Sequence, residues 1–408
     1  MVENVKELLK LHEGIKREVY LDNENSSVVP PEVLDAMQPY YGKRAYGNPT
    51  LTHKPGWEAF TAIMESSQKI ANSIGAKNLE EINFTPGETE ANNLALIGGA
   101  FANPAKGKKI VISEIEPINV LQITELMKAH YGYTTTKVPV NQEGVVDLEK
   151  LKEAVDKETF LVSIAAVNNE IGTIQPLKEA VAIVKDRNPQ ALFHTDASDA
   201  YCRIPFNVQS LKVDMASLSS FKILGPRGTG ALYVREGVNL ERIIEGQIGT
   251  QKLWPGIENT PLIVGFTKAS EMAFSNFDAN VSQMRRMRDR LVDGILSRMT
   301  DVKLNGATGD GRSPDNANIS FLRCEGEALT IELSLKGVYV SSGSACSRRL
   351  LQPSHVLVAI GRRFSEAHGS ILMKTTRYHT EEDINHVLDV LPSSVERIRG
   401  IVGSTGVD

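Results

Sequence analysis

Residues 218–226 read Leu-Ser-Ser-Phe-Lys-Ile-Leu-Gly-Pro, which places one lysine, Lys222, between an apolar run and a glycine-containing turn. A lysine at such a boundary is expected to be partly desolvated. Desolvation lowers the pKa of the amine and makes it a nucleophile toward carbonyl carbons. Lys222 is therefore a candidate Schiff-base lysine. The alternative is that only its aliphatic stem is buried while the ammonium group extends to water.

Short apolar runs alternate with helix-period segments on both sides of Lys222, from about residue 54 to residue 240. The runs are 81–84, 109–112, 159–164, 191–194 and 215–218. Short apolar strands separated by helices predict a mainly parallel sheet covered by helices on both faces. In such sheets, ligands bind at the carboxyl ends of the strands.

The C-terminal part of the chain has a different pattern. A long segment of helical period covers 262–299, and its arginines, Arg288 among them, are expected to form a solvated face. Shorter strands at 319–322 and 338–340 and a helix at 381–390 then predict a smaller α+β domain.

These patterns predict an α/β protein in three parts. We expect a helical extension at 1–18 that packs on the small domain, a large domain at 19–262 and a small domain at 263–408. The large domain is expected to hold a mainly parallel sheet of the seven-stranded type. The smaller α+β domain is expected to carry a loop with a cysteine.

Composition excludes several classes of function. The chain has 408 residues, 41% hydrophobic and 23% charged, with a net charge of -5, which does not favour nucleic-acid binding. No apolar stretch is long enough to span a membrane, and the N-terminus lacks an apolar signal core, so we expect a cytoplasmic protein. The three cysteines and eight histidines show no metal-ligand spacing, so no metal site is expected.

A glycine turn follows the apolar run at 81–84. The sequence Thr85-Pro86-Gly87-Glu88-Thr89 predicts a strand, a turn and a helix start. Main-chain amide groups at a helix start, together with the Thr89 hydroxyl, suit a phosphate. A plain capping box at Thr89 is the alternative.

Two polar motifs follow other predicted strands. Asp196 ends the strand in Phe193-His194-Thr195-Asp196, where a partly buried carboxylate could keep a pyridine nitrogen protonated. A helix cap is the alternative for this aspartate. Asn169 follows the strand that ends near Ala166, so its amide could reach a cofactor oxygen, unless it is only a turn residue.

One cysteine lies in a loop of small residues. The sequence Ser341-Ser342-Gly343-Ser344-Ala345-Cys346-Ser347 is followed by two arginines at 348 and 349. Small residues allow movement and cations lower a thiol pKa, which together indicate an accessible nucleophile. Most lone cysteines are inert core residues, and we interpret Cys202 and Cys324 in that way.

Taken in order, these motifs resemble those of the NifS/IscS-like cysteine desulfurases, which have the class-V aminotransferase fold. The resemblance runs from Val19 to about Leu391. Its motifs are Tyr46-Gly47-Asn48-Pro49, Gly87-Glu88-Thr89-Glu90-Ala91-Asn92-Asn93, Val167-Asn168-Asn169-Glu170, His194-Thr195-Asp196-Ala197, Lys222-Ile223-Leu224-Gly225-Pro226 and the 341–347 loop. The implied fold is that of a fold-type I transferase that uses pyridoxal 5′-phosphate.

The resemblance also implies roles for individual residues. Lys222 would bond to the cofactor aldehyde, Asp196 would lie at the pyridine nitrogen and Asn169 would lie near the ring. Ser219 and Thr89 would contact the phosphate. Cys346 would take sulfur from cysteine as a persulfide and leave alanine. The family is homodimeric, with the cofactor near the subunit interface.

Several positions depart from the family pattern. Pro117 stands where a histidine over the ring is expected, and Phe221 replaces a histidine before the lysine. Asp199 replaces a glutamine that donates to the phenolic oxygen, so it would repel that oxygen or carry a proton. Leu372 replaces the arginine that would hold the substrate α-carboxylate, and Ile257 replaces a threonine that reaches the partner's phosphate.

Other residues could replace what is lost at these positions. Lys374, Arg377 or the two arginines after Cys346 could meet a carboxylate, and Asp199 or Lys222 itself could move protons. We expect a desulfurase that passes sulfur to an acceptor protein or a small molecule. One alternative is a lyase or transferase that acts on a different amino acid or amine. Another is a weakly active scaffold that binds a partner protein.

Overall fold

The seven-stranded sheet at the centre of the large domain is mainly parallel. We describe a computed structural model for residues 6–7, 9–342 and 353–405. The strand order is β2-β8-β7-β6-β5-β3-β4, and β8 alone runs in the direction opposite to the other strands. Their bounds are β2 Ile82–Thr85, β3 Lys109–Ser113, β4 Thr134–Val138, β5 Thr159–Ser163, β6 Leu192–Asp196, β7 Met215–Ser219 and β8 Gly230–Val234.

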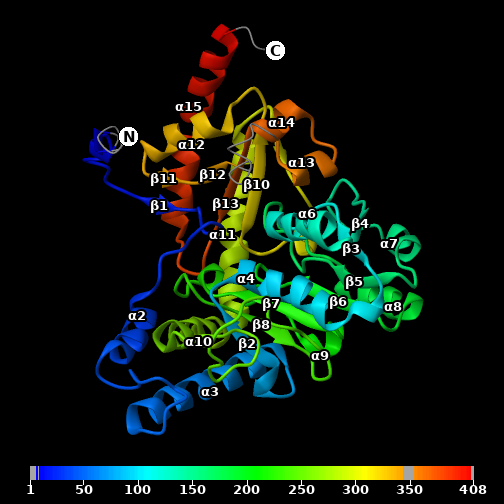
Figure 1. Cartoon of the computed structure of the whole chain (residues 1–408). Coiled ribbons are helices and arrows are strands. Elements are labelled where there is room, and N and C mark those ends of the chain that lie inside the picture. The colour runs from blue at the N-terminus through cyan, green and yellow to red at the C-terminus, as the bar shows by residue number, and fades with distance from the viewer. Residues whose placement is uncertain (1–5, 8, 343–352, 406–408) are drawn as a thin grey trace.

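Helices cover both faces of this sheet (Figure 1). They are α2 Pro31–Met37, α3 Lys54–Ile74, α4 Glu88–Asn93, α5 Gly99–Ala102, α6 Ile118–Tyr131, α7 Leu148–Ala154, α8 Leu177–Arg187, α9 Val208–Leu211 and α10 Thr260–Phe274. The central strands β5, β6 and β7 are buried along their whole length. This explains why β5 and β7 are runs of apolar and small residues rather than alternating patterns.

The small domain holds a four-stranded antiparallel sheet with the order β12-β13-β10-β9. Its strands are β9 Val302–Leu304, β10 Asn316–Phe321, β12 Ser341–Ser342 and β13 Ser370–Lys374. A two-stranded parallel pair joins β1 Val19–Tyr20 to β11 Val338–Tyr339. The helices of this part are α11 Phe277–Arg298, α12 Gly326–Ser334, α13 His355–Ala359, α14 Phe364–His368 and α15 Glu381–Thr405.

The predicted fold class is confirmed, and two local predictions are corrected. The segment 262–299 contains two helices, because α10 ends at Phe274 and α11 begins at Phe277. Arg288 is not on a solvated face: it is 2% exposed, and its Nη1 donates to the Ser313 carbonyl oxygen at 2.9 Å.

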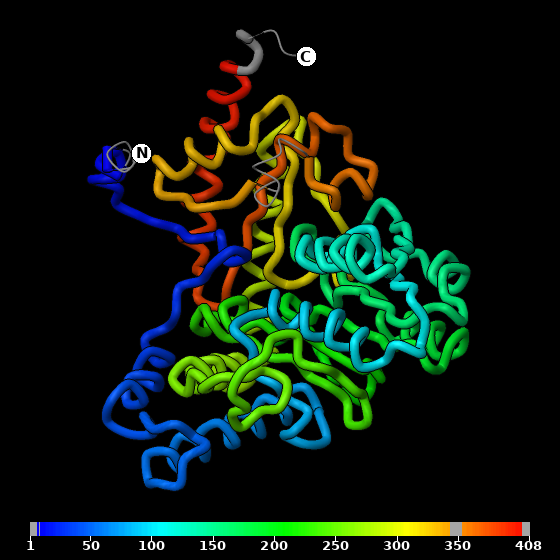
Figure 2. The backbone as a smooth tube through the Cα atoms, in the orientation of Figure 1, coloured from blue at the N-terminus to red at the C-terminus, as the bar shows by residue number. Residues whose placement is uncertain are grey.

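The N-terminal segment crosses from the small domain to the large one. It starts near α12, where His12 Nε2 lies 2.9 Å from Ser334 Oγ, and continues through β1 to α2 and α3. The N-terminal segment (blue) and α15 (red), far apart in the sequence, both lie at the small-domain end of the molecule (Figure 2). In the part of the chain that the structure describes, no helix is long and apolar enough to cross a membrane.

Candidate active site

The candidate site is a cavity of about 640 Å³ between the large sheet and the small domain. The carboxyl ends of the strands deliver polar residues toward it, since Asp196 is the last residue of β6 and Ser219 the last residue of β7. Six of the residues predicted from the sequence line the cavity: Gly87, Glu88, Thr89, Pro117, Asn169 and Phe221. Leu372 of β13 lines it from the small domain.

Lys222 lies in the short 3-10 helix Phe221–Ile223, directly after β7. The turn that closes this helix requires a glycine next to Leu224. A Cβ at Gly225 would lie 3.0 Å from the Ser220 carbonyl oxygen and still closer to Ser220 Oγ. The resulting tight turn points the Lys222 side chain back beneath the small domain, where it is 4% exposed.

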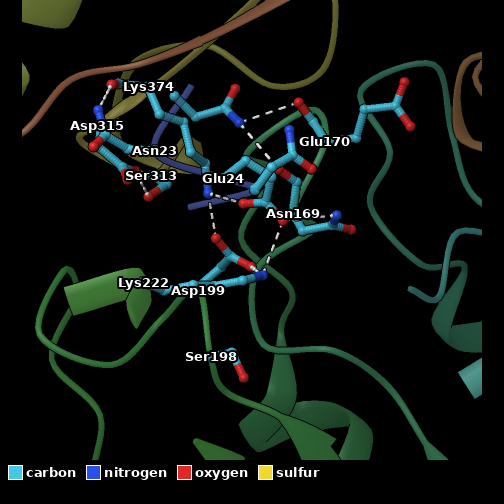
Figure 3. A network of polar contacts seen from close by, with 12 residues as sticks. Asn23, Glu24, Asn169, Glu170, Ser198, Asp199, Lys222, Ser313, Asp315 and Lys374 are labelled. Atoms are coloured by element: carbon cyan, nitrogen blue, oxygen red, sulfur yellow. Dashed lines mark hydrogen bonds and ion pairs between the residues drawn. The ribbon is translucent and has the colours of Figure 1, made fainter. Parts of the chain in front are cut away.

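The Lys222 ammonium group is one corner of a ring of alternating charges (Figure 3). Its Nζ lies 2.6 Å from Asp199 Oδ2 and 2.9 Å from Glu24 Oε1. Lys374 completes the ring, because its Nζ donates to Glu24 Oε2 at 2.6 Å and also to Asp199 Oδ1. We call these four residues the charge ring. Glu88 Oε1 lies outside it, 3.5 Å from Lys222 Nζ.

The expected lowering of the Lys222 pKa is wrong for this structure. Burial does lower the pKa of the amine, but the carboxylates of Asp199, Glu24 and Glu88 outweigh burial and raise it well above its usual value. The alternative of an ammonium group extending to water is also wrong, because the group is buried and bonded to protein carboxylates. Lys222 therefore rests as an ammonium ion.

The other members of the ring have shifted pKa values as well. Burial alone would raise the pKa of Asp199, but Lys222, Lys374 and Arg203 lower it below its usual range. The expectation that Asp199 could carry a proton is therefore wrong in this state. Burial and the Asp199 charge raise the pKa of Glu24. Lys374, expected as one possible partner for a substrate carboxylate, is already bonded to two protein carboxylates.

Asp196 is held in a fixed orientation at the base of the site. Asn92 Nδ2 donates to its Oδ2 at 2.8 Å, and the Ser198 main-chain amide donates to its Oδ1 at 2.9 Å. The contact with the Ser198 amide is local, like the helix cap that was the alternative interpretation of Asp196. Asn92 comes from α4, however, so the Asp196 carboxylate is also tied to the helix that borders the cavity.

The glycine turn before α4 packs closely on the sheet. Gly87 is the N-cap of α4 and no side chain caps the helix, so the capping-box alternative for Thr89 is not observed. A Cβ at Gly230 of β8 would lie 2.9 Å from the Gly87 carbonyl carbon. The Gly87 turn can therefore approach β8 this closely only because residue 230 is a glycine. Ser219, predicted for the same phosphate, is buried with an unpartnered Oγ.

The remaining predicted residues have other partners in this structure. Asn169 Nδ2 donates to Glu24 Oε1 at 3.0 Å, while its neighbour Asn168 is the turn residue, with Oδ1 accepting from the amides of Glu170 and Ile171. Pro117 and Phe221 line the cavity without a polar side-chain group. Arg377 lines a smaller cavity on the other side of Lys222.

The predicted nucleophile Cys346 and the arginines at 348 and 349 lie outside the described residues. The other two cysteines are buried, and burial raises the pKa of the Cys202 thiol to about 12. A thiol with so high a pKa is a poor nucleophile at neutral pH.

Glu24 is the member of the site that the sequence analysis missed. It follows β1 and lies 198 residues from Lys222 and 350 from Lys374 along the chain. No spacing rule links residues so far apart, and the surrounding Asp22-Asn23-Glu24-Asn25 resembles an ordinary polar turn. Only its buried contacts identify it.

Pyridoxal 5′-phosphate is the cofactor implied by the resemblance, and the buried polar groups here fit it. The buried hydroxyl groups of Ser219 and Ser220 have no hydrogen-bond partner among the residues that the structure describes. Each can donate a hydrogen bond to a phosphate oxygen. An amine on Lys222 and an oriented carboxylate on Asp196 complete the set that this cofactor requires. Among the residues described, no group of three or more histidine, cysteine or acidic side chains could hold a metal ion.

Comparison with known proteins agrees with this site. The aminotransferase class-V family matches residues 19–387. Cysteine desulfurase IscS of Dictyoglomus turgidum is 43% identical over 387 residues, covering 95% of this chain and 97% of that protein. Cysteine desulfurase IscS 1 of Archaeoglobus fulgidus is 41% identical and covers 94% and 98%.

Solved structures give the same result. A NifS-like protein superposes with a TM-score of 0.85 at 33% identity, covering 95% of this chain and all of that one. A structure of SspA in complex with cysteine superposes with a TM-score of 0.77 at 30% identity, covering 89% and 100%. The chain thus belongs to the class-V aminotransferase family of pyridoxal-phosphate enzymes, and within it to the IscS-like proteins.

Proposed function

We propose that this protein is a cysteine desulfurase, which converts cysteine to alanine and carries the sulfur on Cys346. The observation that supports this most directly is the pair of IscS relatives, each at least 41% identical over nearly the whole chain. A solved relative that holds cysteine supports an amino-acid substrate of this size. The sulfur acceptor is proposed to be a protein or a small molecule.

The residues divide the work as follows. Pyridoxal 5′-phosphate, when bound, supplies an aldehyde that condenses with amines and a ring that accepts electrons. Lys222 supplies the amine that holds the cofactor. Asp196, oriented by Asn92 and by the Ser198 amide, supplies negative charge at the base of the site. Ser219, Ser220 and the Gly87–Thr89 turn are proposed to bind the phosphate, with Asn169 near the ring.

Cys346 is proposed to receive the sulfur. A sulfur–sulfur bond forms between Cys346 and the substrate sulfur while the carbon–sulfur bond of the substrate breaks. The electron pair of that bond stays on carbon, which takes a proton to become the methyl group of alanine. The balance is one thiol and one cysteine giving one persulfide and one alanine, with no further reactant.

The test measures alanine and sulfide after incubation of the purified protein with cysteine and a reductant. We expect wild type to release both. Cys346→Ala should lose both while keeping the cofactor absorbance, and Cys324→Ser, which changes a buried cysteine remote from the cavity, should behave as wild type. A Cys346→Ala variant as active as wild type would show that sulfur takes another route.

A second candidate follows from Leu372, which lines the cavity where the family carries a carboxylate-binding arginine. A lyase or transferase acting on an amine without an α-carboxylate would suit this apolar side chain. A charge-assisted hydrogen bond between an arginine and a substrate carboxylate contributes roughly 1.5–3 kcal/mol to binding, and Leu372 cannot supply it. If wild type is inactive with cysteine and Leu372→Arg becomes active, the second candidate replaces the first.

We also propose that the enzyme is a cytoplasmic homodimer. The resemblance implies the dimer, and the free, buried state of Cys202 and Cys324 fits a reducing compartment.

A further inference from the structure

Three carboxylates contact the Lys222 ammonium group, and they differ in how many of their oxygens are occupied. Both oxygens of Asp199 accept from lysines. Both oxygens of Glu24 are also occupied, Oε1 by Lys222 and Asn169 and Oε2 by Lys374. Glu88 differs: its Oε1 is at ion-pair distance from Lys222, and its Oε2 is buried without a hydrogen-bond partner.

Glu88 also lies between Lys222 and the space that a substrate would occupy. It is the first residue of α4 and lines the 640 Å³ cavity, 3.5 Å from Lys222 Nζ. Pro117, which lines the same cavity, has no group that can exchange a proton. The site therefore needs another residue for proton transfer, and Glu88 has the position and the vacant oxygen for it.

We propose that Glu88 is the residue that takes a proton from the Lys222 ammonium group and later returns it. The step breaks one N–H bond of Lys222 and forms one O–H bond on Glu88. It converts an ammonium and a carboxylate into a neutral amine and a neutral carboxylic acid, and it needs no other reactant. The amine lone pair is then free to attack a carbonyl carbon.

The charges around Glu88 favour this role. Burial raises the pKa of Glu88 to about 7, with Asp196, Glu24 and Asp199 adding to the increase and Lys222 opposing it. A group that titrates near neutral pH can both accept and release a proton there. Two further charged side chains, Arg227 and Glu90, line the same cavity as Glu88. Asp199 is less suitable, since two lysines and Arg203 lower its pKa.

The proposal rests on the proposed role of Lys222, but not on cysteine as substrate or on Cys346. The test therefore follows the capture of pyridoxal 5′-phosphate by Lys222 rather than turnover. The full chain is treated with hydroxylamine to free the lysine and is then mixed with added cofactor at pH 5–9. Capture is followed by absorbance and by borohydride trapping, with a peptide map to locate the modified lysine.

We expect wild-type capture to slow below about pH 7, as Glu88 becomes protonated and stops accepting the Lys222 proton. Glu88→Gln should capture the cofactor on the order of 10²–10⁴-fold more slowly at pH 7 and should lose this pH dependence. If Glu88 acted only through its charge, Glu88→Gln would instead capture the cofactor faster than wild type. Removal of a carboxylate lowers the Lys222 pKa, leaves more neutral amine and speeds capture.

Two controls separate proton transfer from structural damage. Glu125→Gln removes the same charge from an exposed position on α6 and should capture the cofactor as wild type does. Glu88→Ala should be slow, and added acetate should restore its rate in proportion to concentration. Wild-type rate and pH profile in Glu88→Gln, or a slow Glu88→Ala that acetate does not rescue, would overturn the role of Glu88. A borohydride-trapped group on another lysine would instead overturn the role of Lys222.

Discussion

Lys222 and Lys374 are two buried ammonium groups that share the same two carboxylates. Their side chains are 4% and 2% exposed, and those of Asp199 and Glu24 are 4% and 10% exposed. A buried charge is costly unless it is paired, and the charge ring pairs each member with two opposite charges. The ring holds both lysines in fixed positions and keeps Lys222 protonated until a base takes its proton.

This arrangement predicts a large effect of replacing Lys374. Lys374→Met leaves Glu24 and Asp199 with a single ammonium group between them, which should cost about 3–5 kcal/mol of unfolding free energy. Because Asp199→Asn removes one of the orphaned charges, the double variant should cost less than the sum of the two single changes. Urea denaturation of all four proteins measures this, and additive losses would show that the ring members do not act together.

Glu116 gives a second prediction, which concerns pH. Burial raises its pKa to about 8, although the hydrogen bonds that Oε1 accepts from the Ala165 amide and the Ser113 hydroxyl lower it. Between its usual pKa and about 8 the folded chain keeps the proton and the unfolded chain does not, so this contribution to stability is lost as the pH rises through that range.

Glu116→Gln keeps the shape of the side chain but cannot ionise. The variant should therefore gain stability relative to wild type, by up to about 1.4 kcal/mol per pH unit, between pH 5 and 8. Unfolding free energies of both proteins at several pH values test this. If the difference in unfolding free energy between the two proteins did not change with pH, Glu116 would ionise in the folded protein at its usual pKa.

At the scale of single elements, β13 shows why the small domain contributes to the site. Side chains alternate along a strand, so Leu372 and Lys374 point to one face and Ile371 and Met373 to the other. Ile371 and Met373 pack in the hydrophobic core of the small domain. Leu372 lines the cavity and Lys374 enters the charge ring. A shift of one residue in register would exchange these roles.

The turn after β7 carries the element-scale prediction. Gly225→Ala would place a Cβ against the Ser220 carbonyl oxygen and hydroxyl, in a turn where Leu224 already has a φ of +72°. The change should lower the melting temperature and displace Lys222, so that cofactor capture slows. Gly237→Ala offers a comparison, because its Cβ would meet nothing within 4 Å, although its own φ of +86° carries some strain. Equal capture rates in both variants would contradict a positioning role for the Gly225 turn.

At the scale of the whole molecule, the segment from residue 41 to residue 57, between α2 and the first turn of α3, exposes large apolar side chains. Tyr41, Tyr46 and Trp57 are 65%, 63% and 58% exposed. Exposed apolar groups gathered on one segment commonly mark an interface. We therefore expect this segment to form the contact between two copies of the chain in the proposed homodimer.

Sedimentation of the full chain should therefore give a dimer, and Trp57→Glu should shift the equilibrium toward monomer. The fluorescence of Trp57, one of two tryptophans, should move to longer wavelength on dilution as the indole becomes exposed to water. Leu296→Glu, which changes an exposed leucine on α11, serves as the comparison. A sedimentation coefficient of a monomer at all concentrations would contradict the proposed dimer.

The sequence by itself determined the fold class and the order of the motifs. Buried parallel strands need continuous apolar runs and tight turns need glycine, so β3, β5, β6 and β7 and the Gly87 and Gly225 turns could be located from local pattern. The strands β4, β8 and β13 have the same length of five residues but were not predicted.

Only the tertiary structure decided the chemistry of the lysine. The pKa of Lys222 depends on Glu24, Asp199 and Glu88, which reach it from three separate segments of the chain. Burial and charge oppose each other at this amine, and local sequence shows burial more readily than charge brought from a distance. The sequence therefore pointed to Lys222 as the proposed reactive residue, whereas only the tertiary packing set its protonation state and placed Glu88 beside it.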